Sequence, residues 1–144
     1  GCTLTEEDDG IRLNGPSDGL KGLKVDMNDF SDQALTLAAI APYASSDVTI
    51  THIGHIRGQE CDRLHAIVMN LKNAGITCEE GDDWVCIHPG KPQPCRIETF
   101  DDHRVAMAFA VMGLGCDGIE ILNPGCCKKT FENYFVVLDS LLKH

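Results

Sequence analysis

Strand-like and helix-like segments alternate along this 144-residue chain, and this alternation limits its possible folds more than any other feature. Val48–Ile53 is rich in β-branched residues and ends at Gly54, as a buried strand would. The segment after it predicts an amphipathic helix that stops at Gly75. The apolar stripe of this helix consists of Leu64, Ile67, Val68, Leu71 and Ala74. Such alternation is typical of an α/β fold.

The full pattern predicts repeated β-α-β-α-β-β units. One whole unit spans about residues 22–88, with a helix that begins at Ser31 as N-cap. Its remaining predicted elements are the strands Leu23–Met27 and Val48–Ile53, the Leu64 helix and the hairpin Ile76–Glu80 with Trp84–His88. The flanking predicted elements are the hairpin Cys2–Glu6 with Ile11–Asn14, the strands Arg96–Phe100 and Gly118–Leu122, and the helices Asp102–Leu114 and Lys129–Leu142. Residues 1–144 therefore resemble part of a larger repeated protein.

Composition excludes several classes of function. A formal net charge of -10 disfavours binding to nucleic acid or to an anionic membrane, because both require clustered cations. The longest apolar run, Val105–Leu114, is too short to cross a bilayer. We therefore predict a cytoplasmic protein with one globular domain in this chain.

The eight cysteines contain no CxxC pair, and the six histidines show no metal-ligand spacing. Scattered cysteines of this kind are usually small buried hydrophobes. Neither a GxGxxG motif nor a P-loop is present. The sequence thus predicts no metal and no cofactor, although a non-catalytic metal-binding or interaction module remains an alternative.

Ionisable residues gather at the four predicted strand-to-helix junctions. These groups are Asp32, the stretch Arg57–Arg63, the stretch Asp101–Arg104, and Lys128 with Lys129. Ligand sites of α/β units lie at the carboxyl ends of strands, where helix N-termini attract anions. Arginine and lysine bind carboxylates and phosphates, while neighbouring carboxylates can move protons. We therefore expect one rim that binds anionic substrates and transfers protons.

Each group alone also permits a simpler interpretation. Asp32 could be a first-turn acid that the helix dipole favours. Arg57, Glu60 and Arg63 could form a surface charge ladder. His103 could be a satisfied junction histidine, and the lysines could be solvated. Recurrence at four junctions that topology brings together favours the functional interpretation.

Four strings resemble the ordered C-terminal motifs of the 5-enolpyruvylshikimate-3-phosphate (EPSP) synthase family. They are DMNDFSDQALT at 26–36, IRGQECDRL at 56–64, DHRVAM at 102–107 and KKTF at 128–131. The resemblance implies the enolpyruvyl transferase fold, of which this chain would form about half. It also implies transfer of enolpyruvyl from phosphoenolpyruvate to the 5-hydroxyl of shikimate 3-phosphate, with release of phosphate. Related UDP-N-acetylglucosamine enolpyruvyl transferases share the fold and remain the second hypothesis.

The resemblance also implies roles for single residues. Asp32 would hold and deprotonate the 5-hydroxyl, and Glu60 would shuttle the methylene proton. The residues expected to bind phosphoenolpyruvate are Arg63, Arg104, Lys129 and His103. Those expected to bind shikimate 3-phosphate are Asp32, His55 and Gln59.

Two residues depart from the family pattern. Gln59 stands where lysine is common, which removes a positive charge near the substrate, and His55 stands where asparagine is common. The opposite, N-terminal domain would be the partner of this chain and would supply further substrate contacts. We therefore expect the chain to be catalytically incomplete by itself.

Overall fold

The main sheet has four strands in the order β3-β4-β6-β5 in the computed structural model, which describes residues 1–143. Strand β3 (Lys24–Asp26) runs parallel to β4 (Val48–Thr51), and β6 (Val85–Ile87) is antiparallel to both β4 and β5 (Cys78–Glu80). Side chains alternate along β4 and β6, so that their valines and isoleucines are buried while Thr49 and Cys86 face outward. One face of the sheet thus carries the core.

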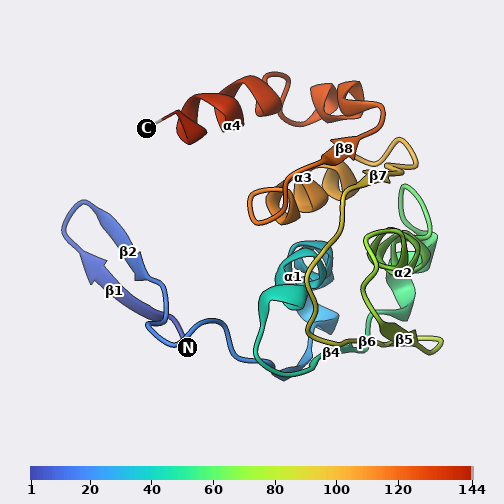
Figure 1. Ribbon diagram of the computed structural model, residues 1–144, viewed down its shortest axis with the longest axis horizontal. Coiled ribbons are helices and arrows are strands. Elements are labelled where there is room, and N and C mark those ends of the chain that lie inside the picture. Colours follow the sequence, from blue (N-terminus) through green and yellow to red (C-terminus); the bar gives the residue numbers. More distant parts are fainter. Residues whose placement is uncertain (144) are drawn as a thin grey trace.

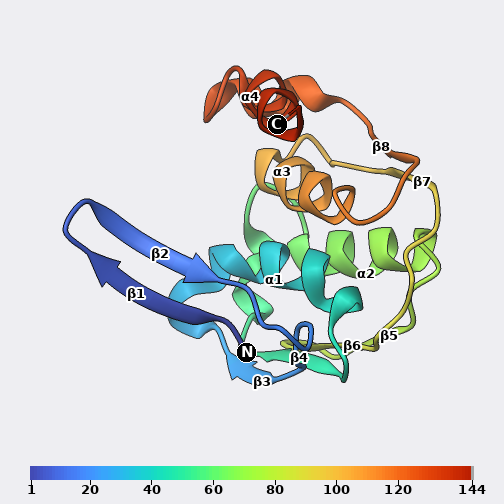
Figure 2. The same cartoon turned by 60° about the vertical axis from the view of Figure 1, so that its left-hand side comes forward.

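Two helices cover that face (Figures 1 and 2). They are α1 (Ala34–Ile40) and α2 (Arg63–Asn73). Short 3-10 helices flank them: η1 (Asn28–Gln33), η2 (Ala41–Tyr43) and η3 (Gly54–Gly58). Between residues 24 and 87 the elements follow the order β-α-β-α-β-β.

The predicted N-cap role of Ser31 is wrong. Ser31 lies inside η1 and is buried, and α1 begins only at Ala34. The Ser31 hydroxyl instead contacts the His55 ring, with 2.7 Å between Oγ and Nε2. The side chain that local sequence predicts as a helix cap therefore makes a tertiary contact with the neighbouring 3-10 helix η3 instead.

The second half of the chain repeats strand and helix above α1 and α2 (Figure 1). The strands β7 (Cys95–Ile97) and β8 (Ile119–Ile121) pair in parallel, with α3 (His103–Met112) between them in sequence. Helix α3 packs against α1, and Phe109 and Met112 extend the same core.

The helix predicted at Lys129–Leu142 begins later, at Tyr134, and Lys129 itself ends a preceding 3-10 helix. The 3-10 helix η4 (Pro124–Lys129) ends where the N–H groups of Thr130 and Phe131 both donate to the carbonyl of Cys127. Helix α4 (Tyr134–Leu142) starts after this turn. Lys129 therefore lies at the end of a 3-10 helix and not in the first turn of an α-helix.

The N-terminal hairpin stands apart from the core (Figure 1). Strands β1 (Thr3–Glu7) and β2 (Gly10–Asn14) confirm the predicted hairpin, and all of their residues are exposed. The register pairs Leu4 with Leu13 and Glu6 with Ile11, so one exposed face of the hairpin carries three apolar side chains next to Glu6. No helix among residues 1–143 is long and apolar enough to span a membrane.

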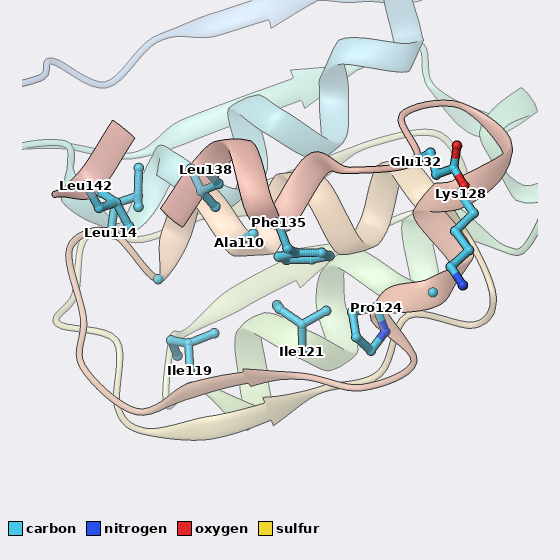
Figure 3. A pocket seen from close by; sticks show the side chains of 12 residues that line it. Ala110, Leu114, Ile119, Ile121, Pro124, Lys128, Glu132, Phe135, Leu138 and Leu142 are labelled. Atoms are coloured by element: carbon cyan, nitrogen blue, oxygen red, sulfur yellow. The ribbon is translucent and has the colours of Figure 1, made fainter. Parts of the chain in front are cut away.

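A second apolar surface lies at the C-terminal end. No residue of α4 is fully buried, and Val136 and Leu141 are largely exposed. Between α4, α3 and β8 lies a hollow of 570 Å³, into which Phe135 and Ile121 point (Figure 3). Helix α4 therefore rests on the core without closing over it.

Candidate active site

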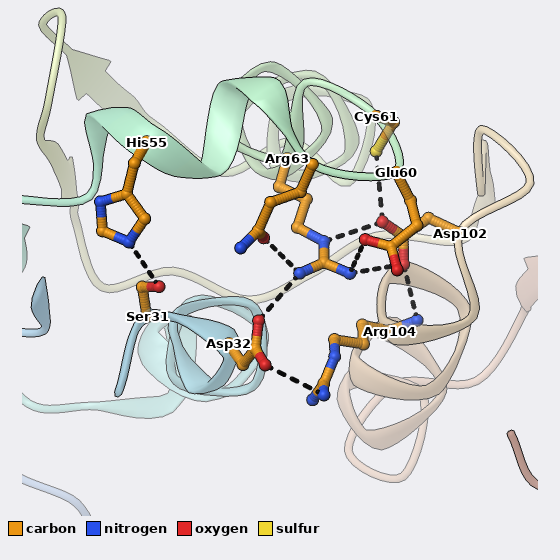
Figure 4. A network of polar contacts seen from close by, with 9 residues as sticks. Ser31, Asp32, His55, Glu60, Cys61, Arg63, Asp102 and Arg104 are labelled. Carbon is orange, nitrogen blue, oxygen red and sulfur yellow. Dashed lines mark hydrogen bonds and ion pairs between the residues drawn. The ribbon is translucent and has the colours of Figure 1, made fainter. Parts of the chain in front are cut away.

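A buried arginine stands at the centre of the polar network (Figure 4). Arg63 is the first residue of α2 and only 2% exposed. Its Nε donates to Asp102 Oδ2 at 2.8 Å, and its Nη1 donates to Asp32 Oδ1 at 3.0 Å and to Gln59 Oε1. Its Nη2 donates to Glu60 Oε2 at 2.7 Å and to Asp102 Oδ1 at 3.4 Å. The five N–H donors of the guanidinium are thus all engaged.

Asp102 holds both arginines in place. It is fully buried, and as the N-cap of α3 it accepts a 2.8 Å hydrogen bond from the backbone N–H of Arg104. Burial opposes ionisation of this carboxyl, but hydrogen bonds from Arg63 and from the Arg104 N–H outweigh burial and hold its pKa below the usual range. Sequence placed Asp102 only in the junction group Asp101–Arg104 and not as a helix cap, although a polar residue directly before a helix was the available signal.

The second arginine, Arg104, is only partly engaged. Its Nη2 lies 3.0 Å from Asp32 Oδ2, so Asp32 bridges Arg63 and Arg104. Among residues 1–143 this is the one ion pair of the Arg104 side chain, which is 36% exposed. A hollow of 230 Å³ opens beside it and is also lined by Asp32. Arg104 thus retains donors for an incoming anion, whereas Arg63 does not.

Cys61 contacts the network without being reactive. Its Sγ lies 3.5 Å from Asp102 Oδ2. Burial, together with the neighbouring Asp102 charge, raises the pKa of the thiol to about 12. Cys61 therefore stays protonated at neutral pH and is excluded as a thiolate nucleophile.

His103 is buried next to the arginines. Its side chain is nearly inaccessible, and its Nδ1 has no hydrogen-bond partner within the described part of the chain. Burial lowers the pKa of His103; the charge of Asp102 opposes this shift, and the nearby charges of Lys129 and Arg104 add to it. Lys129 itself is exposed. His103 is therefore neutral at physiological pH.

We predict that neutral His103 makes the protein less stable at mildly acidic pH. Below a pH of about 6.5 the unfolded chain binds a proton at this histidine more readily than the folded chain does. Stability from this residue is therefore lost as pH falls. In His103→Gln, the free energy of unfolding should decrease less between about pH 7 and pH 5 than in the wild type. Urea unfolding at each pH measures this slope, and an unchanged slope would contradict the assignment.

His55 and Gln59 border the network from η3 and the loop after it. His55 contacts Ser31, and Gln59 accepts a hydrogen bond from Arg63. Glutamine here serves as an acceptor for the buried guanidinium, which a lysine could not do. The structure thus brings Asp32, Glu60, Gln59, Arg63 and Arg104 together.

Arg57 does not belong to this rim. It binds Asp62 Oδ2 at 3.0 Å and Glu80 Oε2 at 3.2 Å, and it donates to the Gly81 carbonyl at 3.0 Å. The expectation that the whole stretch Arg57–Arg63 lines the rim is therefore wrong at Arg57. The alternative that Arg57, Glu60 and Arg63 form one charge ladder on the surface is also wrong. Arg57 anchors the β5–β6 hairpin, whereas Arg63 is buried.

The fold and this network define an α/β protein in which arginines and carboxylates meet at the N-termini of α2 and α3. The sequence model of the family described as EPSP synthase (3-phosphoshikimate 1-carboxyvinyltransferase) matches residues 1–138. The chain belongs to this family. The predicted α/β fold of the enolpyruvyl transferases is thereby confirmed.

Individual relatives agree with this assignment. The chain is 48% identical to the 3-phosphoshikimate 1-carboxyvinyltransferase of Nostoc punctiforme, over 99% of this chain and 33% of that protein. It is 38% identical to the chloroplastic protein of the same name from Brassica napus, over 100% of this chain and 29% of that protein. The solved EPSP synthase of Acinetobacter baumannii superposes with a TM-score of 0.82 at 23% identity, over 96% of this chain and 35% of that one. The chain thus spans about a third of the length of these relatives.

Proposed function

We propose that this chain is the C-terminal part of a 3-phosphoshikimate 1-carboxyvinyltransferase. Its activity would be transfer of enolpyruvyl from phosphoenolpyruvate to the 5-hydroxyl of shikimate 3-phosphate. The observation that carries the proposal is the shared carboxylate Asp32, whose two oxygens each lie 3.0 Å from a different arginine. The names of the relatives favour shikimate 3-phosphate over UDP-N-acetylglucosamine as acceptor.

The geometry suggests how substrate binding prepares the site. The carboxylate of phosphoenolpyruvate would replace Asp32 at Arg104, because Arg104 has open donors and lies beside a hollow. Asp32 would then lose one of its two cationic partners and become a stronger base for the 5-hydroxyl. Binding of one substrate would thereby activate the group that deprotonates the other.

Glu60 suits the second proton transfer. It is about 40% exposed, and among the described residues its side chain is held only by Arg63, so it can reach a bound ligand. Once protonated, it would give its proton to the methylene carbon of phosphoenolpyruvate, while the 5-hydroxyl loses its proton to Asp32 and its oxygen adds to C2, which gives a tetrahedral ketal. Removal of a methyl proton and departure of phosphate then yield the enolpyruvyl ether. Lys129 and neutral His103 would contact the phosphoenolpyruvate, and His55 and Gln59 the shikimate 3-phosphate.

The remaining two thirds of the protein are the proposed partner of this chain. The exposed apolar face of the β1–β2 hairpin supports this, since an isolated two-stranded hairpin is at best marginally stable in water. The exposed side of α4 supports it in the same way. The cytoplasmic location stays a prediction from composition.

The proposed activity is tested on the complete protein, with purified phosphoenolpyruvate and either acceptor. Phosphate release with shikimate 3-phosphate and none with UDP-N-acetylglucosamine is the expected result. The 144-residue chain alone should show no turnover. Titrated with both substrates and followed by NMR, it should show weak shifts around Asp32, Glu60 and Arg104. Turnover with the nucleotide sugar only, or shifts confined to another face, would refute the proposal.

We predict that the hairpin contributes to the complete protein but not to the fold of this chain. The triple change of Leu4, Ile11 and Leu13 to serine should alter the free energy of unfolding of the chain by no more than about 0.5 kcal/mol, because these side chains are exposed. In the complete protein the same change should lower the melting temperature. Equal effects in both would contradict a role for this face in contacting the rest of the protein.

A further inference from the structure

The outer face of the main sheet carries a second cluster of reactive side chains, away from the arginines. Asp47 precedes β4, and Cys86 and His88 lie two residues apart on and after β6. One ligand atom from each of these residues lies within 4.8 Å of the other two. Since β4 and β6 are antiparallel neighbours, with Val48 opposite Ile87, the cluster follows directly from the register.

The partners of His88 resemble those of a metal-binding histidine. Its Nδ1 lies 2.8 Å from Asp47 Oδ1, and its Nε2 lies 3.3 Å from Glu79 Oε1 on β5. Histidine ligands of metals commonly use one ring nitrogen for the ion and donate the other N–H to a carboxylate. Glu79 is placed to accept that N–H, while Asp47 Oδ1 and His88 Nδ1, now 2.8 Å apart in direct contact, would separate slightly to bind one ion.

We propose that Asp47, Cys86 and His88 form a binding site for a zinc-like divalent cation. The ligand set of one oxygen, one sulfur and one nitrogen suits Zn²⁺ and Co²⁺ and does not suit Mg²⁺ or Ca²⁺, which prefer oxygen ligands alone. Ligand atoms around tetrahedral zinc lie roughly 3.3–3.8 Å apart, so the side chains need to move by about 1 Å to close the site. A water molecule would complete the coordination.

The site would be structural and independent of the proposed transferase chemistry. Asp47 lies at the start of β4, whereas His55 and the rest of the candidate active site follow the end of that strand. Cys86 faces away from α1 and α2, since its neighbours Val85 and Ile87 are the buried residues of β6. A bound cation would tie β4 to β6 through side chains in addition to their backbone hydrogen bonds.

A simpler account of the same residues is a metal-free histidine held between two carboxylates. The two accounts differ in the role of sulfur. In the metal-free cluster the one polar contact of Cys86 within residues 1–143 is weak, 3.4 Å from its Sγ to Thr49 Oγ1. In the metal site the Cys86 thiolate is a ligand, so a cobalt-loaded site would show a thiolate-to-cobalt charge-transfer band.

Titration of the reduced 144-residue chain with Co²⁺, without added thiol, tests the proposal. A thiolate-to-cobalt charge-transfer band should grow, saturate at one Co²⁺ per chain and disappear on addition of Zn²⁺. Cys86→Ser should abolish the band, and Glu79→Gln should weaken Co²⁺ binding roughly 10–100-fold. The matched control is Cys116→Ser, which changes another half-buried thiol and should leave the band intact.

Circular dichroism of each variant establishes that it is folded. If Cys86→Ser does not fold, Asp47→Asn and His88→Gln provide the same test, because each removes one ligand while leaving the thiol in place. The proposal is overturned if the wild-type chain gives no saturable band, or if the band survives in folded Cys86→Ser or in both other ligand variants.

Discussion

Replacing Arg63 with methionine should lower the free energy of unfolding of this chain by about 3–5 kcal/mol, the usual cost of removing one partner from a buried ion pair. Arg63 is 2% exposed and Asp102 is fully buried. Without the guanidinium, Asp102 keeps hydrogen bonds only from the Arg104 N–H and the Cys61 thiol. Urea unfolding monitored by circular dichroism measures the loss.

Two further variants show whether the loss comes from the buried charge. Arg96→Met removes an exposed arginine that pairs with Glu120, and should change stability by no more than about 0.5 kcal/mol. The double variant Arg63→Met/Asp102→Asn should recover part of the loss, because asparagine still caps α3 but carries no charge. A loss below about 1 kcal/mol in the single variant would show that Asp102 is not kept ionised by Arg63.

The second large effect is expected in the complete protein. Asp32→Asn should lower kcat by roughly 10²–10⁴-fold, the range for removing a positioned general base. Affinity for phosphoenolpyruvate should stay the same or increase, because asparagine no longer neutralises Arg104. Steady-state kinetics with shikimate 3-phosphate, together with direct binding of phosphoenolpyruvate, separates the two effects.

The control for this prediction is Asp29→Asn. Asp29 lies in the same 3-10 helix as Asp32, is exposed and contacts the side chain of neighbouring Asn28. Its removal should leave kcat unchanged. If Asp32→Asn retains wild-type kcat, or if it loses phosphoenolpyruvate affinity in proportion to kcat, Asp32 is not the base and its bridge between the arginines is only structural.

The network is compatible with the proposed binding of an anionic substrate, although the site contains several carboxylates. Asp102 is committed to holding Arg63 and the N-terminus of α3, and its buried position leaves it little freedom. Asp32 and Glu60 are about half exposed and are bound through single oxygens to each cation. An incoming anion can therefore displace them without disturbing the buried pair.

Much of the fold could be predicted from periodicity. The apolar residues of β4 alternate, so only a strand places them on one face. Those of α2 recur every three to four residues, so only a helix places them on one face. The strand-to-helix junctions then bring most of the predicted ionisable groups, but not Arg57, to one end of the parallel strands. The identities of Asp32, Glu60, Arg63 and Arg104 as candidates followed from those junctions and from the family motifs.

Other features depended on contacts between residues far apart in sequence. Sequence could not show that Arg63 is buried and fully engaged while Arg104 is open, because that difference rests on Asp102, 39 residues from Arg63. Sequence also could not show that Ser31 contacts His55 instead of capping a helix. Nor could it show that Asp47 lies beside Cys86 and His88 across two neighbouring strands. Local patterns determine which elements form, whereas the register and packing of those elements decide which polar side chains share a buried environment.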